Sequence, residues 1–139
     1  MKYYSIAVLL TFNLTLFAQS GIYKLEINNK DQTVVKWTLT LNEDGAFLYH
    51  FFRDISAVSK SSNEVNFYGK GTWVLDGKLF KFRCNDDDLS GQYTVNLNNS
   101  KARYITKSPR DKSDKVVKTA LLFFESETTH IKGLELYKE

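Results

Sequence analysis

The chain has 139 residues, a formal net charge of +3, and a sequence that is 42% hydrophobic. Its lysine and arginine residues are scattered among acidic ones and form no stripe interleaved with aromatic residues, which argues against a nucleic-acid-binding surface. Cys84 is the single cysteine, so no internal disulfide can form and a disulfide-stapled scaffold is excluded.

The first residues have the composition of a cleavable signal peptide. Lys2 supplies a positive charge, and the apolar run 6–17 that follows is too short to span a membrane. Ala18 and Ser20 place small residues at the expected cleavage site. We therefore expect a signal peptide over residues 1–20, one domain over residues 21–139, and a secreted, periplasmic or extracellular location. No later segment is apolar for long enough to form a transmembrane helix.

The rest of the chain is a series of short segments in which apolar and polar residues alternate, each closed by a turn signal. Trp37 and Leu39 share one face of their segment and Thr38 lies on the other, as in a strand with one buried side. Asp76-Gly77 is typical of a tight hairpin. The strand candidates are residues 22–28, 35–41, 47–51, 64–75, 78–84, 92–97, 102–107, 117–125 and 131–138. This pattern predicts an all-β fold, an antiparallel up-and-down barrel of about 8–9 strands.

The segment 115–127 fits two structures. Val117, Leu121 and Phe124 would form a helix stripe behind a cap at Asp114, but the β-branched and aromatic residues of this run suit a pleated sheet better. We predict a strand.

Connections between the strand candidates differ in length. Residues 42–45, 76–77 and 98–100 are tight turns, whereas residues 53–63, 85–90 and 108–114 are longer. Alternate connections of a meander lie at the same end of a barrel, so the longer ones are expected to share one rim. Loops carry binding sites more often than the scaffold does. Arg53 and Arg110 are therefore predicted to bind a ligand at that rim.

Aromatic residues recur at alternating strand positions. A barrel of this size is either filled by side chains or has room for one small ligand, and the sequence leaves both possibilities open. Cys84 shares its strand parity with two of these aromatics and is expected to be a buried apolar residue. The predicted ligand-binding aromatics are Phe47, Tyr49, Phe51, Trp73, Phe80 and Phe82.

Two phrases carry a resemblance to a known family. The stretch Trp37-Thr-Leu-Thr-Leu-Asn-Glu-Asp-Gly-Ala-Phe47 and the later Gly69-Lys-Gly-Thr-Trp73-Val-Leu-Asp-Gly-Lys78 resemble the hairpins of small bacterial secreted lipocalin-like, or calycin-like, β-barrel domains. The resemblance implies an antiparallel barrel and either non-catalytic binding of an apolar ligand or an envelope function. In lipocalins proper a Gly-x-Trp signature lies on the first strand, whereas Gly71-Thr72-Trp73 is mid-chain, so no binding residue of that family carries over.

Motifs for catalysis and metal binding are missing from the sequence. It contains no Gly-x-Ser-x-Gly, no His-Glu-x-x-His and no glycine-rich phosphate loop. His50 and His130 each stand alone, and His50 is expected at the surface. Asp86-Asp87-Asp88 begins like a calcium loop, but Leu97 occupies the twelfth position, where a glutamate is needed, which favours an acidic turn.

We therefore expect a non-catalytic secreted domain that binds a small apolar or amphipathic ligand without a cofactor or metal. The alternative is an envelope or extracellular module that binds another protein or has a structural role.

Overall fold

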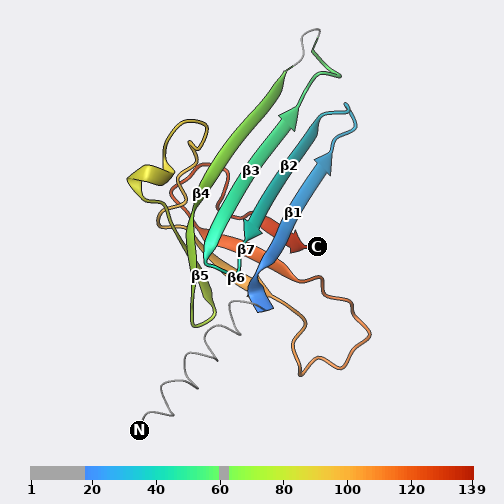
Figure 1. Ribbon diagram of the computed structural model, residues 1–139. Coiled ribbons are helices and arrows are strands. Elements are labelled where there is room, and N and C mark those ends of the chain that lie inside the picture. The colour runs from blue at the N-terminus through green and yellow to red at the C-terminus, as the bar shows by residue number, and fades with distance from the viewer. Residues whose placement is uncertain (1–17, 60–62) are drawn as a thin grey trace.

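Figure 1 shows the computed structural model, which describes residues 18–59 and 63–139. The strands are β1 (Gly21–Asn28), β2 (Val34–Leu41), β3 (Ala46–Asp54), β4 (Glu64–Asp76), β5 (Leu79–Arg83), β6 (Lys101–Ile105), β7 (Ala120–Glu125) and β8 (Glu135–Lys138), with a 3-10 helix η1 (Asp86–Asp88) after β5. Each strand pairs antiparallel with its neighbours, and β8 pairs with β1 to close the barrel. The prediction of an all-β up-and-down barrel is confirmed, with eight strands.

Most of the predicted signal peptide, residues 1–20, lies outside the described residues, so its cleavage stays a prediction. In the part of the chain that is described, no helix is long and apolar enough to cross a membrane.

The β2–β3 hairpin shows how local sequence sets the register. Gly45 has a φ of +88°, which favours glycine, and Asp44 accepts a hydrogen bond from the backbone N–H of Ala46 at 2.8 Å. This turn places Leu41 opposite Phe47 and Leu39 opposite Tyr49. Because side chains alternate between faces along a strand, all four point into the barrel together.

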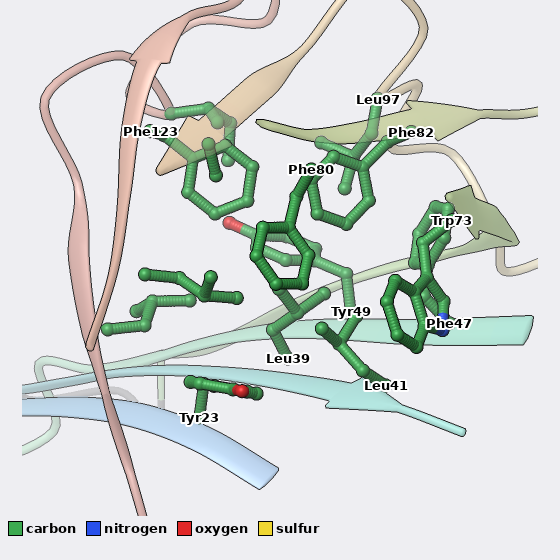
Figure 2. Close-up of a cluster of buried hydrophobic side chains, with 14 of the residues drawn as sticks. Tyr23, Leu39, Leu41, Phe47, Tyr49, Trp73, Phe80, Phe82, Leu97 and Phe123 are labelled. Atoms are coloured by element: carbon green, nitrogen blue, oxygen red, sulfur yellow. The ribbon is translucent and has the colours of Figure 1, made fainter. Parts of the chain in front are cut away.

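The interior of the barrel body is filled (Figure 2). Trp73 stacks on Phe80 with 5.6 Å between ring centroids, and Phe82 lies between Phe47 at 5.4 Å and Phe123 at 5.2 Å. The largest fully buried hydrophobic side chains are Trp73, Tyr23, Phe47, Phe80, Phe123, Leu39, Leu41, Leu97, Leu121, Ile131 and Leu136. Aromatic burial of this extent is the main source of stability for a domain of this size.

Two further predictions about individual segments are confirmed. Residues 120–125, inside the ambiguous segment 115–127, form strand β7 rather than a helix. Cys84 is buried, its sulfur accepts a hydrogen bond from the backbone N–H of Leu97 at 3.5 Å, and burial raises the pKa of its thiol.

The expected strand at residues 92–97 is wrong. This segment makes a single parallel bridge, between Tyr93 and Tyr68 of β4, and Val95 donates its N–H to the carbonyl of Tyr68 at 2.9 Å. The reason is that β6 pairs directly with β5, Leu79 opposite Arg103, so no edge remains between them for another barrel strand.

Losing that strand changes which loops share an end of the barrel. The β1–β2, β3–β4, β5–β6 and β7–β8 connections lie at one end, which we call the β3–β4 end. The β6–β7 connection, residues 106–119, lies at the opposite end with the tight β2–β3 and β4–β5 turns (Figure 1). The expectation that residues 53–63, 85–90 and 108–114 share one rim is therefore wrong for the last of these loops.

Strands β1 to β4 extend past the barrel body at the β3–β4 end (Figure 1). Among the described residues, β8 pairs only with Tyr23 and Lys24 of β1, and β5 pairs only with residues 72–76 of β4. Residues 25–28, 34–37, 51–54 and 64–67 thus form a four-stranded extension, called here the projecting sheet. Its inner face continues the lining of the barrel beyond the filled core.

Candidate functional site

The site is an apolar pocket of about 490 Å³ where the projecting sheet leaves the barrel body. Aromatic side chains of three adjacent strands line one wall: Trp37 on β2, Tyr49 and Phe51 on β3, and Phe67 on β4. The opposite wall comes from the β5–β6 and β7–β8 connections. It consists of Thr94, Val95, Asn96, Glu127, Thr128, Thr129, His130 and Ile131.

The aromatic wall follows directly from strand register. Trp37 is opposite Phe51, and Phe51 is opposite Phe67, so their rings form one row across three strands. Ring centroids are 5.5 Å apart for the first pair and 5.9 Å for the second. Phe67 keeps 47% of its surface exposed, unlike the aromatics of the core. The row is therefore a packed surface that still faces open space.

Two glycines of β4 allow close approach of neighbouring segments, Gly69 at the loop wall and Gly71 in the barrel body. A Cβ at Gly69 would lie 2.9 Å from the carbonyl oxygen of Val95, and one at Gly71 would collide with the carbonyl of Arg83 and lie 2.8 Å from the ring of Phe47. Only a residue without a Cβ allows the backbones to come so close. Gly69 therefore allows Val95 to sit against β4 and form part of the pocket.

Hydrogen bonds hold the loop wall in place. The Thr128 hydroxyl donates to the backbone carbonyl of Asn96, which joins the β7–β8 connection to the β5–β6 connection. At the base of the same loops the hydroxyls of Ser100 and Ser126 lie 2.8 Å apart. Both pocket walls are thus built into the fold, as is usual for ligand sites that are largely formed before binding.

Trp37 is the most unusual group in the pocket. Its Nε1 is buried and has no hydrogen-bond partner among the described residues. A buried unpaired donor costs about 1–3 kcal/mol of stability, and because Nε1 is enclosed by the protein it is not a group that faces the pocket. Tyr49, on the neighbouring strand, is buried, and this burial raises the pKa of its phenol, which keeps the group neutral.

The sequence-predicted residues divide between core and pocket. Tyr49 and Phe51 line the pocket, whereas Phe47, Trp73, Phe80 and Phe82 are at most 5% exposed and pack against one another in the core. Ligand contact by these core residues stays a prediction. Phe67 belongs to the alternating aromatics that the sequence suggests as a possible pocket lining, although it is not among the predicted ligand-binding residues, and Trp37 is predicted only as a strand residue. Trp37 shares the inward face of β2 with Leu39, and Phe67 shares the inward face of β4 with Gly69. Only the register between the strands shows that the two side chains line the same pocket.

The two predicted arginines lie at opposite ends of the barrel. Arg53 is on β3, two residues beyond Phe51 on the same inner face, opposite Val35 and Val65. Arg110 is exposed in the β6–β7 connection, at the end with the tight turns. They were predicted to share a rim. Because residues 92–97 do not form a barrel strand, the connection that contains Arg110 lies at the other end of the barrel.

The histidines also lie apart. His50 is on the outer face of β3, stacked on Tyr68 at 4.5 Å, with its Nε2 2.7 Å from Oδ1 of Asn66. His130 and Glu127 both border the pocket, but no hydrogen bond or ion pair between them occurs in the described residues.

The acidic turn is built by local hydrogen bonds. Asp88 caps η1 by accepting a hydrogen bond from the N–H of Asn85 at 2.8 Å. In the described part of the chain, no group of three or more His, Cys, Asp or Glu side chains is arranged to hold a metal ion.

No protein-family model, curated protein or solved structure matches the chain.

Proposed function

We propose that this chain is a non-catalytic, secreted lipocalin-like protein that binds a small apolar or amphipathic ligand at the β3–β4 end of its barrel. The observation that carries the proposal is the pocket of about 490 Å³ with its aromatic wall. Ligand pockets of about 300–1,000 Å³ lined by apolar and aromatic side chains, with a few polar groups at the rim, are the usual form of small-molecule sites.

The filled core supports this location over the barrel interior. Phe47 and Trp73 are each 1% exposed, so a ligand deep in the barrel body would have to displace packed aromatic rings. Displacement of that kind costs several kcal/mol per side chain, about as much as a core cavity. A ligand between the projecting sheet and the loop wall displaces nothing and covers apolar surface that is otherwise exposed.

The test is binding of N-phenyl-1-naphthylamine, a neutral apolar dye whose fluorescence rises in apolar surroundings. The variant Phe51→Ala should weaken binding at least tenfold because it removes the centre of the aromatic row. Phe52→Ala is the matched control, since Phe52 is next to it on β3 and faces outward. Equal affinity of both variants and the wild type would contradict the proposal. Native mass spectrometry of protein from its source should show the natural ligand.

One observation favours the alternative of a protein-interaction module. Residues 25–28 of β1 and 64–67 of β4 are strand edges without a second partner strand in the described part of the chain. Such edges can pair with a strand of another protein. Glu26→Pro, at the same β1 edge but on the outer face of the sheet, should then prevent complex formation in light scattering while dye binding persists.

A further inference from the structure

The inner face of the projecting sheet carries a single charge on an apolar surface. Its outermost row is Ile27, Val35, Arg53 and Val65, and the row beneath it is Leu25, Trp37, Phe51 and Phe67. Side chains two residues apart along a strand share a face, so Arg53 stands directly beyond the aromatic wall of the pocket. Ile27 on β1 and Phe67 on β4, the two edge strands of the projecting sheet, are 42% and 47% exposed.

Arg53 has no carboxylate of its own. In the described residues the ion pairs are Lys24–Glu139, Lys36–Glu26, Lys81–Asp76 and Lys101–Glu125, and none includes Arg53. The undescribed residues, 1–17 and 60–62, contain no Asp or Glu in their sequence. An arginine side chain usually keeps its charge and forms strong bidentate hydrogen bonds with carboxylates. Arg53 is exposed and is solvated in the free protein, so an anion that reaches this apolar face meets a charge for which no carboxylate of the described residues competes.

The acidic residues near this end lie elsewhere. Asp54 and Glu64 are opposite each other but on the outer face of the sheet, and Asp54 accepts a hydrogen bond from the N–H of Ser56 at 2.8 Å. Glu127 borders the pocket from the loop wall, not from the sheet. Arg53 is thus the charged residue on the sheet side and Glu127 borders the loop side, an arrangement that favours an anionic head at the sheet.

We propose that the pocket binds a long-chain alkyl carboxylate, with the alkyl chain against Trp37, Phe51 and Phe67 and the carboxylate at Arg53. This inference rests on the proposed function, because it names the ligand class of the same pocket. The apolar rows of the projecting sheet cover the chain, and the guanidinium of Arg53 donates hydrogen bonds to both carboxylate oxygens. Binding makes and breaks no covalent bond.

The test compares two probes of equal length, dodecanoate and dodecan-1-ol, by titration calorimetry at neutral pH, low salt and submicellar concentrations. The wild type should bind dodecanoate about tenfold more tightly than the alcohol, as expected for one charge-assisted hydrogen-bonded pair. Arg53→Gln should bind the two probes equally, with the affinity for the alcohol unchanged. Arg83→Gln, at an exposed position on β5, is the matched control and should keep the preference.

The outcomes distinguish the proposed function from the carboxylate specificity of the pocket. If neither probe binds to the wild type, the proposed function falls. If both bind with the same affinity, or if Arg53→Gln keeps the preference for dodecanoate, the pocket stands and its carboxylate specificity is overturned. In the expected case, higher salt reduces the preference because the pair is partly exposed and screened.

Discussion

The two tryptophans of the chain should respond in opposite ways to the same substitution. Trp73 is 1% exposed, stacks on Phe80, and donates from Nε1 to the backbone carbonyl of Asn42 at 3.0 Å. Trp37 is partly buried at the pocket, and its Nε1 has no partner among the described residues. Phenylalanine at either position keeps an aromatic ring but removes the indole N–H.

The expected changes in the free energy of unfolding follow from these contacts. Trp73→Phe should lose about 2 kcal/mol, roughly half from the hydrogen bond and half from the space left by the smaller ring. Trp73→Ala should lose about 3–5 kcal/mol, out of the roughly 5–15 kcal/mol available to a domain. Trp37→Phe removes an unpaired buried donor and only a few atoms from a wall that faces open space. Its stability should equal or exceed that of the wild type.

Urea unfolding followed by far-UV circular dichroism measures these differences, provided that the denaturant slope is the same for each variant. Dye binding gives a second measurement, which Trp37→Ala should weaken and Trp73→Phe should leave intact. Equal destabilisation by Trp37→Phe and Trp73→Phe would contradict this expectation, because Trp37 would then belong to the packed core and not to a binding surface.

Gly71→Ala should destabilise the domain by about 2 kcal/mol or more in urea unfolding, because its Cβ would collide with the backbone of β5. Gly91→Ala, with open space around it and a φ of +61°, should lose only about 1 kcal/mol, and equal losses would contradict the close-approach argument. Burial raises the pKa of Tyr49 above the unfolded-state value of 10. The neutral phenol therefore contributes its full stabilisation below pH 10, and this stabilisation is lost as the pH rises from 10 toward the raised pKa of the folded state. Tyr49→Phe should therefore lose less stability above that pH, and parallel curves would argue against the assignment. N-terminal sequencing of exported protein should begin between Gln19 and Gly21, whereas an intact first methionine would disprove processing.

Much of the fold could be predicted because its determinants are local. Alternation along Trp37 and Leu39 defines the inner face of β2, and Asp76-Gly77 sets the β4–β5 hairpin, where Gly77 has a φ of +62°. The burial of Cys84 and the strand at residues 120–125 followed from the same rules. These features depend on residues close together in the chain, so a single sequence is enough to show them.

The position of the site could be predicted only in part. Phe47 and Phe51 have the same sequence signature, yet Phe47 is buried in the core and Phe51 lines the pocket. The difference arises because β5 to β8 cover only part of the length of β1 to β4. That coverage depends on how far each strand pairs with its neighbour, which local alternation does not record.

The sequence by itself determined the strand pattern, the inward faces and the tight turns. Only the tertiary structure decided that residues 92–97 lie beside β4 instead of entering the barrel, which places Arg53 and Arg110 at opposite ends. A segment becomes a barrel strand only if two neighbouring edges are free to accept its backbone hydrogen bonds. Here β5 and β6 use those edges to pair with each other.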